Sequence, residues 1–286
     1  MMLQFAANLA SSPDEILERM RQNIARKGIT RFSPSNLTLP RKFALACYGP
    51  SLLDTWERMR GQSVVSVSGA HDFLVERGII PIYHVECDSR PHKAAFLQKP
   101  QEMTTYLIAS CCHSSIFEQL QGFKIRMWHR DEGNISARIR ELLLQLDPGS
   151  QLVQGGTTVG GRALNLLLRL GARKIDIHGM DCSYRGEQVW AGSHSGEIHK
   201  SRFKNKVAGK IFETSTTMYN AMVDFFDLLE YTGHRRCEYI VHGDGMLAWT
   251  LAGMGRKEVN SQKDLLNPVD RTVVKEDTSQ SMVYEF

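Results

Sequence analysis

The sequence predicts an α/β protein with a Rossmann-like, mainly parallel sheet, helices on both faces, an N-terminal helix and a long lid-like loop. Three observations support this fold class. Short apolar segments alternate with helical patterns along most of the chain. A Gly-Pro-Ser turn at 49–51 follows the first core strand, and a glycine-rich turn at 154–161 opens a later helix. Alternation of this kind implies right-handed βαβ units, whose ligand sites lie at the carboxyl ends of the strands.

The chain begins with a predicted amphipathic helix. Ser12 precedes a proline and two acidic residues, a typical helix start, and apolar residues recur at fourfold spacing up to Lys27. A Ser-Pro-Ser-Asn run then interrupts the pattern before the first core strand. We therefore predict an N-terminal helical extension, 1–40, followed by a nucleotide-binding domain, 41–255.

Strands and helices then alternate within the predicted domain. The predicted strands are 41–47, 63–68, 82–87, 105–110, 124–128, 174–178 and 238–242. The predicted helices are 52–59, 71–77, 134–146, 159–170 and 216–231. The stretch 181–211 is the longest without an expected element, and its small and basic residues predict a lid. The polar tail, 256–286, is expected to be an arm, a partner-bound segment or disordered.

Composition excludes several classes of protein. With 286 residues of which 42% are hydrophobic, the chain can bury a large core. A net charge of +4 with dispersed basic residues does not indicate nucleic-acid binding. The apolar runs are too short for a membrane span and no signal-peptide block is evident, so we expect a cytoplasmic protein. The six cysteines form no CxxC pair and are expected to be buried, reduced thiols.

The two glycine-containing turns are candidate phosphate sites because main-chain amides at a helix start carry partial positive charge. The candidate residues of the first turn are Tyr48, Gly49, Pro50 and Ser51. An ordinary βα turn explains this fragment equally well. The candidate residues of the second turn are Gly155, Gly156, Thr157 and Thr158, whose hydroxyl groups can also cap the helix.

Arg162 lies in the first turn of the helix that follows the second glycine turn. A cation there opposes the helix dipole unless an anion lies nearby. We therefore predict that Arg162 helps to hold a phosphate. The alternative is an arginine that points to solvent, where the unfavourable interaction costs little.

Acidic residues stand at two predicted strand ends. Glu86 and Asp88 follow a period of two, which would place both carboxylates on one strand face at the ligand-binding edge. They could hold Mg²⁺ or a ribose hydroxyl, or act as ordinary turn caps. Asp181 follows Gly179 at the end of a later strand and is a candidate catalytic residue.

Histidine is the natural general base near neutral pH. His194 and His199 lie in the predicted lid, where either could deprotonate an acceptor hydroxyl after closure. Their spacing of five does not suit a zinc pair on one helix face. His178 is expected to be a core histidine with its hydrogen bonds satisfied.

The motifs occur in one order over residues 41–199: Gly-Pro-Ser-Leu, Asp88 after Gly-Ile-Ile-Pro, and Gly-Gly-Thr-Thr-Val leading to Ile-His-Gly-Met-Asp. This order resembles the family of hydroxymethylpterin diphosphokinase-like proteins, which includes the motility accessory factor flagellin glycosyltransferases. It is similar, more distantly, to bacterial CMP-sialic acid sialyltransferases. The resemblance implies a nucleotide-linked donor at the two glycine turns and a base downstream of Asp181. Cys47 and Tyr48 depart from the small or amide residues usual before Gly-Pro-Ser, which leaves the donor open.

We expect a glycosyltransferase that uses a nucleotide-activated sugar, such as a CMP-linked one. The alternative is a diphosphokinase that transfers pyrophosphate from ATP to a pterin-like alcohol, with Mg²⁺ between the phosphates. A non-catalytic nucleotide-binding scaffold is the third hypothesis. The expected partner is a small nucleotide donor, while the acceptor and the oligomeric state, including a homo-oligomer, stay open.

Overall fold

The computed structural model describes residues 11–33, 41–131, 133–192, 202–232, 237–256 and 283–285. Nine strands of this part form one sheet in the order β1-β6-β5-β4-β3-β2-β8-β11, with β7 beside β6, and neighbouring strands run parallel. The strands are β1 (Thr30–Arg31), β2 (Lys42–Ala46), β3 (Val64–Val67), β4 (Tyr83–Glu86), β5 (Thr105–Ala109), β6 (Ile125–Arg130), β7 (Leu152–Val153), β8 (Lys174–His178) and β11 (Glu238–Val241). The predicted α/β, parallel, Rossmann-like fold is confirmed.

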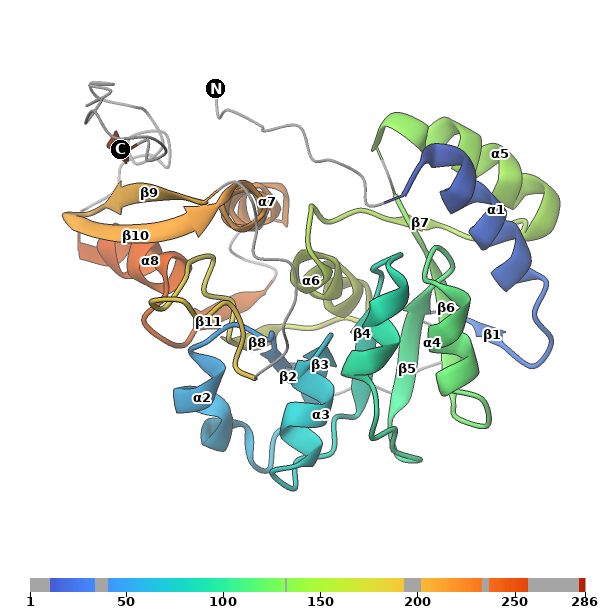
Figure 1. Ribbon diagram of the computed structural model, residues 1–286, viewed down its shortest axis with the longest axis horizontal. Coiled ribbons are helices and arrows are strands. Elements are labelled where there is room, and N and C mark those ends of the chain that lie inside the picture. Colours follow the sequence, from blue (N-terminus) through green and yellow to red (C-terminus); the bar gives the residue numbers. More distant parts are fainter. Residues whose placement is uncertain are drawn as a thin grey trace.

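Helices cover both faces of the sheet (Figure 1). The α-helices are α1 (Pro13–Ile24), α2 (Leu52–Thr55), α3 (Ala70–Val75), α4 (Ser114–Gln119), α5 (Ser136–Leu146), α6 (Val159–Arg169), α7 (Thr216–Thr232) and α8 (Met246–Arg256). Short 3-10 segments are η2 (Trp56–Met59), η3 (Pro91–Phe96) and η4 (Gly133–Ile135). Along β2, Phe43 and Leu45 belong to the core on the α6 side, whereas Ala44 and Ala46 pack on the side of α2 and α3.

The strand order changes direction at β2. From β2 the chain proceeds outward through β3, β4, β5 and β6, and α6 then returns it to β8 on the other side of β2. The turn after β2 and the turn after β8 therefore meet at the carboxyl edge, where the Gly49 amide donates to the Gly179 carbonyl at 2.8 Å. In open parallel sheets, ligands bind at such a switch point.

Several element boundaries differ from the sequence prediction. The predicted helix 52–59 divides into α2 and η2, and α4 and α8 were missed. α4 has only six residues, too few for a clear helical period. The described part of the predicted extension, 11–33, joins the main domain, because β1 pairs with β6 and α1 packs against α5.

The predicted lid, 181–211, needs correction at 202–211, where strands replace the expected loop, and its first residues are packed rather than open. Residues 181–192 pack on the domain, where Cys182, Tyr184 and Ala191 are buried. Strand β9 (Arg202–Val207) then pairs antiparallel with β10 (Lys210–Ser215), and β12 (Val283–Glu285), from the predicted tail, lies parallel to β9. The two strands form a hairpin because a two-residue turn, Ala208-Gly209, joins Val207 to its partner Lys210. Residues 193–201, with His194 and His199, lie outside the described part.

The β9–β10 turn holds a residue type that suits it poorly. Ala208 has a φ of 46° and Gly209 a φ of 80°, as in a type I′ turn, which favours Asn-Gly. Because Ala208 is exposed, we expect Ala208→Asn to raise the free energy of unfolding by about 0.5–1 kcal/mol. Urea denaturation measures the gain, and Ala208→Val, which is β-branched, is expected to lower stability instead.

Within the described residues, no helix has the length and apolar character needed to cross a membrane.

Candidate functional site

A cleft of about 1550 Å³ opens at the carboxyl edge of the sheet. Gly49 and Pro50 of the first turn and Gly155 to Thr158 of the second line the same cleft, together with Asp88 and Asp181. The prediction that both turns face one edge of the sheet is confirmed. Two non-glycine residues with left-handed backbone, Ser68 (φ 45°) and Cys182 (φ 55°), also line it, and such strain is concentrated at functional sites.

The first turn is closed by Asp181. The carboxylate of Asp181 accepts a hydrogen bond from the Ser51 amide at 3.0 Å. Gly49 is required here, since a Cβ would clash with this carboxylate and with the Gly179 carbonyl. Burial raises the pKa of Asp181, while the hydrogen bond from Ser51 acts in the opposite direction. An amide predicted to bind phosphate is thus occupied by a carboxylate of the protein.

Of the residues in the first turn, Tyr48 lines the cleft but Ser51 does not. Tyr48 lines the cleft, and its ring packs edge-on against Phe73 and Phe96, with centroids 6.4 and 6.2 Å away. Ser51 is fully buried beneath Gly243 and does not line the cleft. The predicted direct contact of Ser51 with a donor is therefore not supported by its position.

The second glycine turn is closed in the same way by Asp224 on α7. The Asp224 carboxylate accepts from the Thr157 amide at 2.7 Å and from the Thr157 hydroxyl at 2.9 Å. Gly156 has a φ of 77°, and a Cβ on it would clash with the Asp224 side chain. Thr158 caps α6, as predicted, by accepting from the Gly161 amide at 3.4 Å. Asp224 was missed because it lies in a distant helix with no motif around it.

Burial of Arg162 overturns the interpretation of an arginine that points to solvent, whereas its contact with a phosphate stays a prediction, since the residue lines the cleft. Its side chain is buried and donates to three main-chain carbonyls, those of Gly156 at 3.0 Å, Asp131 at 2.6 Å and Val153 at 2.9 Å. The guanidinium therefore ties the glycine turn to the ends of β6 and β7. These carbonyl oxygens lie against the cation at the helix start, where it would otherwise oppose the helix dipole.

The predicted metal pair does not form one open site. Glu86 is buried and accepts from the amides of Cys87 and Asp88 and from the Ser68 hydroxyl, at 2.8, 2.9 and 3.0 Å. Asp88 instead faces the cleft and binds Arg90. Strand β4 ends at Glu86, so the period of two no longer holds at Asp88. Among the described residues, no three His, Cys, Asp or Glu side chains are placed to share a metal ion.

Basic and aromatic residues on η3, at its N-cap Arg90 and at Trp190 complete one wall of the cleft. Arg90 and Lys93 pair with Asp88, and His92 also lines the cleft. Phe96 and Trp190 lie edge to face at 6.5 Å and form an apolar surface beside them. These residues were not recognised in the sequence, although Arg-Pro-His-Lys directly after Asp88 was an available signal.

His178 is in the core, as expected, but its hydrogen bonds are not satisfied. Within the described part of the chain neither ring nitrogen has a partner, and the ring stacks on His242 at 4.3 Å and 10°. Burial, followed by the charge of His242, lowers the pKa of His178 to about 4.

Stability is therefore expected to fall on acidification. His178 has a pKa of about 6.5 in the unfolded chain and about 4 in the folded protein. Because the unfolded chain takes up the proton first, the free energy of unfolding is highest above pH 6.5 and falls as the pH is lowered towards 4. The loss from His178 is about 3 kcal/mol. Urea denaturation across this range measures it, and His178→Phe, which keeps a ring in the stack, is expected to flatten the dependence. An unchanged slope in this variant would contradict the assignment.

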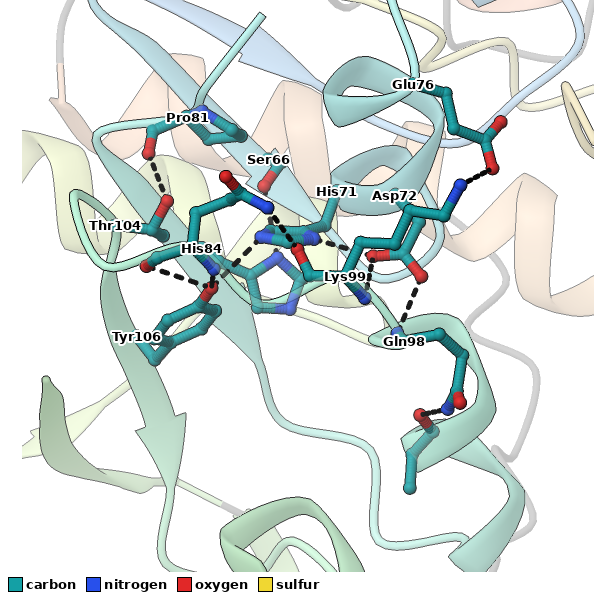
Figure 2. Close-up of polar contacts among 12 residues, drawn as sticks. Ser66, His71, Asp72, Glu76, Pro81, His84, Gln98, Lys99, Thr104 and Tyr106 are labelled. Atoms are coloured by element: carbon teal, nitrogen blue, oxygen red, sulfur yellow. Dashed lines mark hydrogen bonds and ion pairs between the residues drawn. The ribbon is translucent and has the colours of Figure 1, made fainter. Parts of the chain in front are cut away.

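A second buried polar cluster lies away from the cleft, between α3 and the sheet (Figure 2). His71 bonds to Asp72 at 2.8 Å and to the Tyr106 hydroxyl at 3.2 Å. Asp72 also accepts from the amides of Gln98 and Lys99, at 2.6 and 3.3 Å. The cluster therefore fixes the segment that follows η3.

Comparison with known proteins agrees with this architecture. Residues 15–187, which include both glycine turns, match the family described as 6-hydroxymethylpterin diphosphokinase MptE-like. The structure is similar to MAf glycosyltransferase from Magnetospirillum magneticum AMB-1, with a TM-score of 0.62 and 15% identity over 87% of this chain and 42% of that chain. It is also similar to a mammalian sialyltransferase, with a TM-score of 0.44 and 10% identity over 82% and 87%. The chain thus spans less than half of the MAf protein. No curated protein matches the sequence.

Proposed function

The chain belongs to the family of 6-hydroxymethylpterin diphosphokinase MptE-like proteins, and from this membership we propose that it is a transferase acting on a nucleotide-activated donor, most specifically a glycosyltransferase. The family resemblance stated from the motifs is confirmed by the match. The observation that carries the proposal is the cleft at the switch point, which brings both glycine turns, basic residues and an aromatic wall together.

The cleft offers a separate surface for each part of such a donor. The aromatic surface of Tyr48, Phe96 and Trp190 suits the flat face of a nucleobase. Arg90 and Lys93, at the start of η3 and on it, suit the phosphate that leaves with the nucleotide, because charge develops on this phosphate during transfer. His92 is the described histidine of the cleft that can accept the acceptor's proton, alongside the earlier candidates His194 and His199. Asp181 is expected to hold the first turn rather than to transfer a proton, since it is 7% exposed and bonded to Ser51.

A diphosphokinase is the second candidate, and the description of the family favours it. The donor would then be ATP, and Mg²⁺ would bridge its phosphates. Asp88 faces the cleft and could serve as a Mg²⁺ ligand, but its two oxygens are paired with Arg90 and Lys93. The described residues therefore do not form a resident metal site, and a metal ion would arrive with the nucleotide phosphates.

A panel of nucleotides separates the candidates. Thermal unfolding is measured with CMP, UDP, GDP and ATP, each with and without Mg²⁺, because a ligand at 100 times its Kd stabilises the folded state by about 2.7 kcal/mol. Stabilisation by CMP without metal supports the glycosyltransferase, and stabilisation by ATP only with Mg²⁺ supports the diphosphokinase. Trp190→Ala is expected to abolish the shift, whereas Trp249→Ala, outside the cleft, serves as its control. No shift with any nucleotide would contradict both candidates and the nucleotide-binding scaffold as well.

A further inference from the structure

We infer that Arg90 and Lys93 are the binding site for the phosphate of the donor and that Asp88 is a built-in competitor that occupies this site until the donor arrives. This assignment rests on the proposed function, since it names where the donor's phosphate binds in the same cleft.

The three side chains form a compact ion cluster. The Arg90 Nε lies 3.0 Å from each carboxylate oxygen of Asp88, and Nη2 lies 2.5 Å from Oδ2. The Lys93 Nζ lies 3.4 Å from the same Oδ2. An arginine fork and a lysine converging on two oxygens are also the contacts that proteins make with phosphate. The carboxylate thus stands where a phosphate oxygen could bind.

The cluster is well placed to retain strong charge interactions. The side chains of Lys93 and Asp88 are only 12% and 13% exposed, so solvent screens them less than a surface pair. Lys93 also lies over the Phe96 ring at 4.7 Å. Burial raises the pKa of Asp88, but the hydrogen bond and charge of Arg90 and the charge of Lys93 outweigh it and lower this pKa to about 2. Asp88 therefore carries a full negative charge at neutral pH.

One main-chain amide in each of the two turns first expected to bind phosphate is already occupied by a carboxylate. Asp181 accepts the Ser51 amide, and Asp224 accepts the amide and hydroxyl of Thr157. A phosphate at either turn would face a buried or half-buried carboxylate, which like-charge repulsion disfavours. Arg90 and Lys93 can instead exchange one anion for another, and Arg130 adds positive charge to the same part of the cleft.

The segment that carries these cations is held in place. Asp72 binds the amides of Gln98 and Lys99 just beyond η3, and it is itself oriented by His71 (Figure 2). The cations are thus ordered before a ligand binds, which lowers the entropy cost of binding it. Asp88→Asn leaves this support intact and removes the competing charge, while its side-chain oxygen can still accept from the Arg90 amide, as the carboxylate does at 3.0 Å.

Inorganic pyrophosphate without metal is the probe, measured by isothermal titration calorimetry on the full chain. Asp88→Asn is expected to tighten binding about fivefold, and Lys93→Gln to weaken it about tenfold. Lys93→Arg should restore most of the affinity. The controls carry the same change in charge outside the cleft: Asp54→Asn, whose partner is Arg185, and Lys99→Gln, whose partner is Glu76. Both should change the affinity less than twofold.

The direction of the Asp88→Asn effect decides the outcome. The assignment would be overturned if this variant bound pyrophosphate no more tightly than the wild type. It would also be overturned if Lys93→Gln and Lys99→Gln had equal effects, or if neither the wild type nor Asp88→Asn bound pyrophosphate. Should Asp88→Asn fail to fold, Lys93→Gln and Lys93→Arg against Lys99→Gln decide it. Because the probe contains no nucleotide, this result is independent of the nucleotide panel, and either proposal can fail alone.

Discussion

Replacing Gly179 by alanine is expected to lower the free energy of unfolding by about 3 kcal/mol or more. Gly179 has a φ of 67°, in the left-handed region that alanine enters only at a cost. A Cβ would also clash with the carbonyl oxygen of Cys47 and lie 3.0 Å from the Leu52 Cβ. The clash is with the main chain of the turn directly after β2, which cannot move without opening the switch point.

Gly171→Ala is the matched control for this variant. Gly171 has a φ of 85°, but no atom of the described residues lies within 4 Å of the position that a Cβ would take, so alanine there meets only the backbone cost. We expect a loss of about 1–2 kcal/mol for this control. Urea denaturation of both proteins measures the difference. Equal losses would show that the Cys47 carbonyl can shift and that the contact between the two turns is loose.

Arg162→Gln is expected to have the other large effect, a loss of about 3 kcal/mol of stability together with weaker ligand binding. The buried guanidinium bonds to three carbonyls from two segments, that of Asp131 after β6 and those of Val153 and Gly156 at the end of β7 and in the glycine turn. A shorter neutral side chain leaves the carbonyls of Gly156 and Asp131 without this donor, and unpaired buried carbonyls are costly, whereas the Val153 carbonyl keeps the Asp131 amide. The glycine turn around Gly156 would lose its tie to β6 and β7, so the cleft would lose its shape as well.

Arg169→Gln provides the comparison on the same helix. Arg169 donates to the Leu152 carbonyl at 2.8 Å and to Gln151, but these bonds are exposed to solvent. Its replacement is expected to cost less than about 1 kcal/mol. Denaturation measures stability, and pyrophosphate titration measures the effect on the cleft. A small loss from Arg162→Gln would mean that water replaces the guanidinium, which would refute its role as the tie.

The sequence correctly predicted that the two glycine turns bind an anion, but it did not indicate that the anion is a carboxylate of the protein itself. Amides at a helix start attract an anion, and each turn does hold one. The anions are the carboxylates of Asp181 and Asp224, and the second belongs to a helix 67 residues further along the chain. Sequence distance gives no indication of such a contact, because only the packing of α7 against α6 creates it.

The sequence alone determined the alternation of strands and helices, the parallel sheet and the meeting of two glycine turns at one edge. Each of these follows from local periodicity, turn chemistry and the handedness of βαβ connections. Only the tertiary structure decided which groups remain available in the cleft. Whether Arg162 binds a ligand or three carbonyls, and whether Glu86 faces the cleft or its own strand end, depends on what packs beside them. Side-chain partners are chosen in three dimensions by burial and charge, and those are properties of the assembled fold.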